Sequence, residues 1–468
     1  MSDLFDAYPY ASRFPVLRAI PEQGRDRDQI LAELRLLAQE EDSSWQGGQC
    51  SGTMYSGDHA HYGFLEQAFG LFGHANALQR DLCPSATRFE GEVIAMTLDL
   101  MHADAARSAG HDPVGMMTGG GTASILQAML AYRDHAAKYR SIDRPNVVRP
   151  STAHPAFAKA AHLFGMELRT IPVDPQTTLV DPERLAEEID ANTVAIIGSA
   201  GNYPYGTIDP IADLGALALE RGVGLHVDGC LGGFLLPFAE QLGYPIPAFD
   251  FRVPGVTSIS ADTHKYAYGL KGTSTVLFRD KVVRNAAYFA EADWVGGKYF
   301  SPGMEGSRST GLLASAWASL VATGAEGYRR YAREIFEASY AMQAAVRSHP
   351  DLRLLGDPTF LFAFTSDSFD PYHVSEHMAR KGWRFNGLQY PNGVHFAVTR
   401  PQTQPGVTDR FAADLAEGVA YAQANRDTPS RTGAIYGGFP GGPTPESGSM
   451  LELLMGQLMD AQLSVPMP

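Results

Sequence analysis

The sequence predicts an α/β protein, with a large domain around a mostly parallel sheet and a smaller α/β domain toward the C-terminal end. The strand–helix–strand order of "TVAIIGS", "IADLGALALERG" and "VGLHVD" indicates a right-handed parallel unit. A glycine-rich turn, "MTGGGTAS", opens another helical segment. Beyond about residue 330 a long amphipathic helix introduces a segment of different character, which is typical of the link into a second domain.

Length and composition narrow the class of protein. With 468 residues, 44% of them hydrophobic and 19% charged, the chain is typical of a globular protein with two or three structural units. A net charge of −15 without a basic block argues against nucleic-acid binding. We expect neither a signal peptide nor a transmembrane helix, since no apolar run approaches roughly 20 residues. Three sparse cysteines favour a reducing compartment, so the expected location is the cytoplasm.

Apolar spacing predicts the elements of the first part of the chain. A helix is expected over residues 26–42. Its apolar stripe consists of Ile30, Leu31, Leu34, Leu36 and Leu37. A second helix is expected over 121–139, directly after three glycines.

The central part predicts the sheet. Residues 193–199 are typical of a buried strand, 211–222 of a helix ended by Gly222, and 223–228 of the next strand. Ligands of such sheets bind at the carboxyl ends of the strands, and Asp228 stands at one of these ends.

The C-terminal part predicts a helix, two strands and further helical segments. In order, these are a helix over 327–349, strands near 358–366 and 393–399, a helix over 408–425, and a Gly/Pro loop at 437–448 before a final short helix.

Four features of the sequence point to chemistry, and the first is the loop at 117–124. Gly119, Gly120, Gly121 and Thr122 stand at the start of a helix, where free N–H groups and the positive end of the helix dipole suit a phosphate. The loop lacks the Gly-Lys-Ser/Thr of a Walker A motif and the glycine spacing of a dinucleotide fingerprint. By itself it is equally compatible with a tight turn.

His154 and Asp228 are the second and third features. His154 precedes a helix among small residues, where its imidazole is either a stacking partner for a flat ring or a hydrogen-bonded loop residue. Asp228 ends an apolar strand, where a buried carboxylate needs a cationic partner. A turn or N-cap aspartate is the alternative for Asp228.

Lys265, in "SISADTHKYAYGLKG", is the fourth feature and has few charged neighbours. It is either an ordinary loop lysine or a desolvated lysine that forms a Schiff base with a carbonyl. Pyridoxal 5'-phosphate requires a lysine for its aldehyde, a carboxylate for its pyridinium nitrogen, a ring to stack on and a phosphate cradle. The four features together supply all of these, which favours this cofactor. No Cys/His cluster has ligand spacing, so no metal site is expected.

Longer segments carry a resemblance to a known family. "SISADTHKYAYGLKGTS", "HVDGCLGGFLLPF", "GSAGNYPYGTIDPI", "STAHPAFAKAAHLFGMEL" and "SGTMYSGD" together resemble the sphingosine-1-phosphate lyases, which are among the pyridoxal-phosphate decarboxylases with the aspartate-aminotransferase fold (fold type I). The resemblance runs from about Cys50 through "KGWRFNGLQYPNGVHFAVT" to "AIYG". The membrane helix of eukaryotic members has no counterpart here, so a soluble, bacterial form is expected.

The resemblance implies a homodimer with shared active sites. It divides the chain into an N-terminal segment (1–75) that contributes to the dimer and the active site, a large cofactor-binding domain (76–330) and a small C-terminal domain (331–468).

By the same resemblance, Lys265 is the Schiff-base lysine, Asp228 pairs with the pyridinium nitrogen and His154 stacks on the ring. Gly121 and Thr122 hold the cofactor phosphate. His264 lies beside that phosphate, and Gly297 and Ser307 reach the cofactor phosphate of the neighbouring subunit.

The resemblance also implies the substrate contacts. Lys271, with Tyr55 from the partner subunit, holds the substrate phosphate, and Tyr203 lies near the reacting hydroxyl. Asn76 and Gln79 belong to "NALQ", where the family commonly has "NPLH" near the substrate phosphate. Arg308 has a supporting role.

The chain departs from the family pattern at informative positions. Gln79 replaces a histidine, and its amide donates a hydrogen bond to a phosphate but does not titrate near neutral pH. The family's "TSGGTES" is "TGGGTAS" here, with Gly119 and Ala123 in place of serine and glutamate. These changes bear on substrate preference more than on cofactor binding, because backbone N–H groups provide most of the latter.

The expected activity is retro-aldol cleavage of a small phosphorylated amino-alcohol lipid to phosphoethanolamine and a long-chain aldehyde. Either Lys265 or Tyr203 is the base for the 3-hydroxyl. An amino-acid decarboxylase on the same scaffold is the first alternative, because it shares the cofactor site. A non-catalytic protein that binds the cofactor or a partner is the second.

Overall fold

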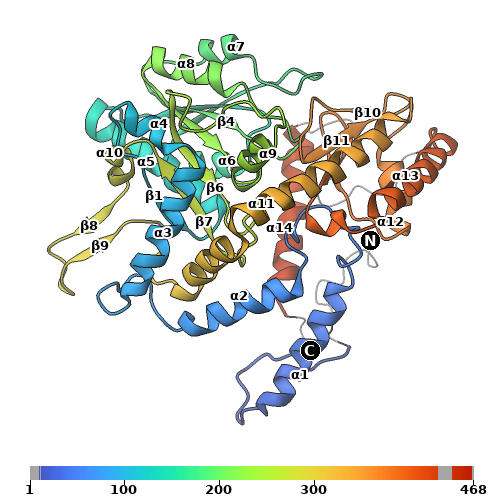
Figure 1. Cartoon of the computed structure of the whole chain (residues 1–468), viewed down its shortest axis with the longest axis horizontal. Coiled ribbons are helices and arrows are strands. Elements are labelled where there is room, and N and C mark those ends of the chain that lie inside the picture. The colour runs from blue at the N-terminus through green and yellow to red at the C-terminus, as the bar shows by residue number, and fades with distance from the viewer. Residues whose placement is uncertain (1–9, 11, 429, 431–444, 466–468) are drawn as a thin grey trace.

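A computed structural model describes residues 10, 12–428, 430 and 445–465 (Figure 1). Its main sheet has seven strands in the order β1-β7-β6-β5-β4-β2-β3. The strands are β1 (Val114–Thr118), β2 (Asn146–Pro150), β3 (Glu167–Ile171), β4 (Thr193–Ser199), β5 (Gly224–Asp228), β6 (Val256–Ala261) and β7 (Ser274–Phe278). β7 runs antiparallel to both of its neighbours, and every pair from β6 across to β3 is parallel. The predicted mostly parallel sheet and the strand over 193–199 are confirmed.

Helices cover both faces of this sheet because alternate strand residues point to opposite sides. Ala195 and Ile197 of β4 pack in one apolar cluster with α5 (Gly121–Arg140) and α6 (Ala156–Phe164). Ile196 belongs to the cluster on the other face. The helices of that face are α3 (Pro84–Leu100), α4 (Ala103–Ser108), α8 (Ile211–Arg221) and α9 (Leu236–Gln241). The predicted helices over 121–139 and 211–222 are therefore confirmed, and Gly222 ends the second of them in a left-handed conformation.

The smaller domain has a four-stranded antiparallel sheet in the order β10-β11-β13-β12. Its strands are β10 (Arg353–Leu354), β11 (Leu361–Thr365), β12 (Asn386–Leu388) and β13 (Gly393–Ala397), and its helices are α12 (Tyr372–Arg380) and α13 (Val407–Ala424). These elements confirm the predicted strands and helix. The linking element α11 (Thr310–Arg347) consists of two helices joined at a kink, where Gly324 is non-helical, and the second of them agrees with the helix predicted over 327–349.

The remaining elements are short or lie at the ends of the chain. They are α2 (His59–Phe72), α7 (Pro182–Glu187), the 3-10 helices η1 (Gly232–Phe234) and η2 (Arg400–Thr403), α10 (Lys281–Ala286), the hairpin of β8 (Phe289–Glu291) and β9 (Tyr299–Ser301), and α14 (Pro445–Gln462). Most of the predicted Gly/Pro loop at 437–448 lies outside the described residues. In the part of the chain that is described, no helix has both the length and the apolar content needed to cross a membrane.

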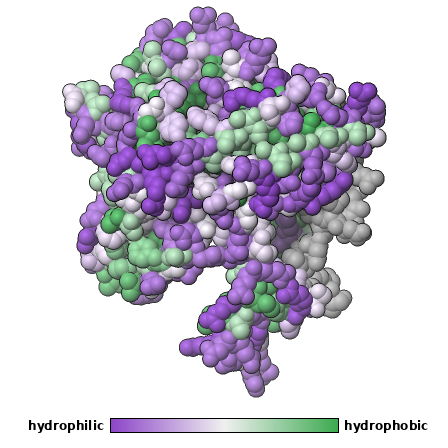
Figure 2. All heavy atoms as spheres, turned by 45° about the vertical axis from the view of Figure 1, so that its right-hand side comes forward, coloured by the Kyte–Doolittle hydropathy of each residue, from purple (hydrophilic) through white to green (hydrophobic). Residues whose placement is uncertain are grey.

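The first helix, α1 (Arg27–Asp42), projects from the body of the molecule (Figure 1). Asp26 caps it by accepting hydrogen bonds from the N–H groups of Asp28 and Gln29, so the helix forms where the sequence predicts. None of its residues is buried within the described chain, and its apolar side chains appear as green patches on the projecting segment of Figure 2. The predicted stripe is thus present but uncovered.

Candidate active site

A cavity of about 630 Å³ lies at the carboxyl ends of the main-sheet strands. The residues that follow β1, β2, β4, β5 and β6 line it on one side. Residues 51–55 and the small-domain sheet close the other side, and they are joined because Ser51 Oγ accepts a hydrogen bond (2.9 Å) from the N–H of Ala397. Segments from all three parts of the chain therefore meet at this cavity.

The glycine-rich loop forms one wall. Helix α5 begins at Gly121 without a side-chain cap among the described residues, so its first N–H groups face the cavity. A Cβ added at Gly121 would lie 2.6 Å from Oδ2 of Asp262, so only glycine fits this approach. Thr122 also lines the cavity, and His264 lies against Gly120. This wall suits an anion of the size of phosphate.

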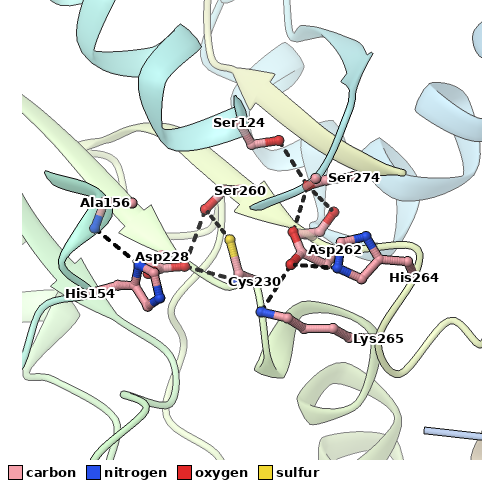
Figure 3. Close-up of polar contacts among 12 residues, drawn as sticks. Ser124, His154, Ala156, Asp228, Cys230, Ser260, Asp262, His264, Lys265 and Ser274 are labelled. Carbon is pink, nitrogen blue, oxygen red and sulfur yellow. Dashed lines mark hydrogen bonds and ion pairs between the residues drawn. The ribbon is translucent and has the colours of Figure 1, made fainter. Parts of the chain in front are cut away.

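Lys265 lies in the cavity with Asp262 beside it (Figure 3). Its Nζ is 2.9 Å from Oδ2 of Asp262, a carboxylate that is 1% exposed. Burial lowers the pKa of Lys265, but Asp262, followed by Tyr55 and Cys230, together outweigh it and the pKa is raised overall. Sequence reasoning missed Asp262, although it stands three residues before the lysine.

Asp228 and His154 lie in the same cavity, from the ends of β5 and β2 (Figure 3). Asp228 Oδ1 accepts hydrogen bonds from the N–H of Cys230 (3.0 Å) and from Ser260 Oγ (3.3 Å). His154 Nδ1 accepts a hydrogen bond from the N–H of Ala156 (3.1 Å), which leaves the ring directed at the cavity. Desolvation lowers the pKa of His154, so the imidazole is neutral and suited to stacking.

These residues fit pyridoxal phosphate. The cavity brings together a lysine, a carboxylate, a flat neutral side chain and a helix start that a Cβ would obstruct, which are the groups that this cofactor requires. When bound, the cofactor supplies an electron sink for bond cleavage at the amine-bearing carbon.

Lys271 and Tyr55 form the outer part of the cavity. Lys271 Nζ donates to the carbonyl of Thr53 (2.9 Å) and lies 4.5 Å from the centre of the Tyr55 ring. Burial, and then repulsion from Lys265, lower the pKa of Lys271 to about 8. Burial raises the pKa of Tyr55 to about 12. The expectation that Tyr55 comes from the partner subunit is wrong for this cavity, because residues 51–55 fold across the cavity of their own chain.

Tyr203 lies in the cavity and stacks on His395, with ring centres 4.7 Å apart and an interplanar angle of 29°. His395 comes from β13 of the small domain and is fully buried. Burial lowers its pKa to about 4, so it is neutral. Sequence reasoning missed His395 and its neighbour Asn386, because only the folded sheet brings them to a loop that precedes them by more than 180 residues.

Four expected site residues lie outside this chain's own cavity: Asn76, Gln79, Gly297 and Ser307. Asn76 Nδ2 donates to Ser307 Oγ (2.9 Å), so these two lie together. Gln79 is exposed, and Gly297 lies in the turn of the β8–β9 hairpin with a positive φ of 101°.

Arg308 and Glu90 support the glycine-rich loop from behind. Arg308 donates to the carbonyl of Met117 (2.7 Å), and Glu90 accepts from the N–H of the same residue (2.8 Å). Arg308 and Glu90 also pair with each other at 3.1 Å, and Arg80 pairs with Glu90 as well. Burial raises the pKa of Glu90, but the two guanidinium groups outweigh it and lower the pKa overall. Glu90 is a further residue that sequence reasoning missed.

Comparison with known proteins agrees with this site. The family model of the pyridoxal-dependent decarboxylase conserved domain matches residues 12–362. A sphingosine-1-phosphate lyase of Arabidopsis thaliana is 42% identical over 430 residues, which cover 90% of this chain and 77% of the relative. The chain belongs to the sphingosine-1-phosphate lyase family.

Solved structures extend this comparison. The sphingosine-1-phosphate lyase of Burkholderia pseudomallei is 52% identical, with a TM-score of 0.92, and the match covers 98% of this chain and all of the other. A glutamate decarboxylase of Lactobacillus brevis is 19% identical with a TM-score of 0.73, a likeness in fold alone over 90% of this chain and 98% of the other. The predicted fold type I architecture and pyridoxal phosphate as the cofactor are confirmed for this family member.

Proposed function

We propose that the protein cleaves sphingoid base phosphates, such as sphingosine 1-phosphate, to phosphoethanolamine and a long-chain aldehyde. The observation that carries this proposal is a second lysine, Lys271, which lines the cofactor cavity of a sphingosine-1-phosphate lyase family member beside Tyr55. A substrate phosphate brings negative charge into a chain whose net charge is −15, so it needs a local cation.

Each residue of the cavity has its own role in the proposed reaction. With the cofactor bound, Asp228 would keep a proton on the ring nitrogen, His154 would stack on the ring, and Gly121 and Thr122 would hold the cofactor phosphate beside His264. Lys265 would hold the cofactor through its aldehyde and be replaced there by the amine of the substrate.

On the substrate side, Lys271 and Tyr55 hold the phosphate. Tyr203 and the released Lys265 both lie in the cavity as candidates for moving the proton of the 3-hydroxyl.

The proposed enzyme is a homodimer with shared sites. Gly297 and Ser307 would complete the cofactor phosphate site of the partner, with Asn76 and Gln79 near the partner's substrate phosphate. Exposed apolar side chains on and near the β8–β9 hairpin support this proposal: Phe289, Trp294, Val295 and Phe300. A Lys265→Ala variant and a Ser307→Ala variant are mixed so that they form hybrid dimers, and restored activity in this mixture would support shared sites.

We also propose a cytoplasmic location, which the three free cysteines favour.

Mass spectrometry of the products tests the reaction. Purified holoenzyme incubated with sphingosine 1-phosphate is expected to release phosphoethanolamine and a long-chain aldehyde. Lys265→Ala is expected to lose both the visible absorbance of lysine-bound cofactor and turnover. Full activity in this variant, or carbon dioxide release from amino acids without cleavage of the lipid, would refute the proposal.

A further inference from the structure

Asp262 is a second carboxylate of the cavity, and the roles proposed above leave it unused. It follows β6, and its Oδ2 lies 2.9 Å from Nζ of Lys265 and 3.6 Å from Nε2 of His264 (Figure 3). Bringing two charges out of water is costly, so a buried pair is weak support for stability by itself. The pair therefore calls for a role in the chemistry of Lys265.

A chain of hydroxyl groups orients this carboxylate (Figure 3). Asp262 Oδ1 accepts a hydrogen bond from Ser274 Oγ (2.6 Å), and Ser274 Oγ is 2.8 Å from Ser124 Oγ in α5. Ser124 Oγ is in turn 2.6 Å from Thr118 Oγ1 at the end of β1. Because Oδ1 is held by this chain, Oδ2 is the oxygen that faces Lys265.

The two carboxylates of the cavity have separate environments. Asp228 Oδ1 is held by Cys230 and Ser260 at the end of β5. In the described part of the chain, Asp262 is the one carboxylate within 4 Å of Lys265 Nζ. The charge on the lysine nitrogen thus depends on Asp262.

We propose that Asp262 is the counter-ion that keeps the Lys265 nitrogen positively charged, both in the free enzyme and after this nitrogen has joined the cofactor aldehyde. When the lysine ammonium condenses with the aldehyde, two of its hydrogens leave with the carbonyl oxygen as water. The third hydrogen and the positive charge stay on the nitrogen. A charged nitrogen makes the adjoining carbon more electrophilic toward the substrate amine. Burial opposes this charge, and the carboxylate opposite it offsets that penalty.

Other titratable groups face Asp262 and Lys265 and also influence the pH at which the lysine nitrogen loses its proton. They are His264 and Lys271 on the same segment, Tyr55 from the segment before α2, His154 before α6, and Asp228 and Cys230 after β5. All of them are unchanged in the variants below, so a difference between variants is due to Asp262.

The test is a pH titration of the absorbance spectrum of the bound cofactor. In the wild-type holoenzyme, the band of the protonated nitrogen is expected to persist into the alkaline range. In Asp262→Asn, it is expected to disappear at a pH lower by about 1 to 3 pH units, the usual effect of removing one adjacent opposite charge. Asp262→Glu, which keeps a carboxylate, is expected to restore much of the alkaline limit.

Two further variants separate this role from a structural one. Ser274→Ala leaves the ion pair but removes the hydrogen bond that stabilises the charged carboxylate, so a smaller shift in the same direction is expected. Asp209→Asn is the matched control: Asp209 is also 1% exposed but accepts its hydrogen bond from the N–H of Ser199 (2.8 Å), and its loss is expected to leave the titration unchanged.

An Asp262→Asn titration that matches the wild type overturns the proposal. If that variant folds but takes up no cofactor, an unchanged Ser274→Ala titration overturns it instead. The proposal rests on the cofactor and not on the proposed substrate. A normal set of titration shifts without cleavage of sphingosine 1-phosphate would refute the proposed function alone.

Discussion

Raising the pH through about 8 is expected to weaken productive binding of a phosphorylated substrate through one residue, Lys271, whose pKa is lowered to about 8. Burial is the larger cause and repulsion from Lys265 the second. An ordinary lysine, with a pKa of about 10.4, stays charged well above this pH. The structure therefore predicts an alkaline loss of kcat/KM, because this quantity reports the pKa values of the free enzyme.

The size of the loss follows from the contact that disappears. A hydrogen bond to a charged group contributes about 1.5–3 kcal/mol. At about 1.36 kcal/mol for each factor of ten, kcat/KM is expected to fall by about 10- to 150-fold between the charged and the neutral lysine. The decline approaches tenfold per pH unit above about 8 until this floor is reached.

Steady-state kinetics across the neutral and alkaline range provides the assay, with Lys271→Arg as the matched control. A guanidinium group stays charged throughout, so the ratio of wild-type to Lys271→Arg kcat/KM isolates the titration of position 271. This ratio is expected to fall above about pH 8. Lys271→Met is expected to start at the low floor and to lack this step. A ratio that stays constant with pH would show that Lys271 does not bind the substrate phosphate as a cation.

Two further predictions concern stability. Glu90→Ala leaves Arg308 without its buried partner, and we expect the free energy of unfolding in urea to fall by about 3–5 kcal/mol. The pKa of Glu90 is lowered in the folded protein. Its contribution to stability is therefore fully present above the ordinary glutamate pKa of about 4.3 and is lost as the pH falls through the folded pKa. A decrease in the free energy of unfolding of less than about 1 kcal/mol in the variant, or a decrease that does not depend on pH, would contradict this role. Gly119→Ser puts a Cβ 2.8 Å from Oε1 of Glu305, which accepts the N–H of Gly119; the end of the flexible Glu305 side chain must move and lose this hydrogen bond, at an expected cost of about 0.5–1.5 kcal/mol. Combining it with Glu305→Ala should recover part of that cost, whereas strictly additive costs would refute the contact.

The sequence predicts those parts of the site whose function follows from local pattern. Lys265, Asp228 and the Gly121 loop are recognisable because each stands where a strand ends or a helix begins, and parallel strands bring such ends to one edge. His395 and Glu90 are different. His395 reaches the cavity through strand pairing in the second domain, and Glu90 through an ion pair with a residue more than 200 positions away. No local spacing encodes either contact.

Gly119, one of the departures from the family pattern, also has a contact that the local sequence does not reveal. From the sequence, glycine in place of the family's serine bears on substrate preference more than on cofactor binding. In the structure, the N–H of Gly119 donates to Glu305 (2.8 Å), and the Glu305 carboxylate occupies the space that a serine side chain would fill. Glu305 lies on the segment that also carries Ser307, the proposed contact to the partner's cofactor. At position 119, a carboxylate from a distant segment therefore lies where a serine side chain would stand, and its hydrogen bond ties that segment to the glycine-rich loop.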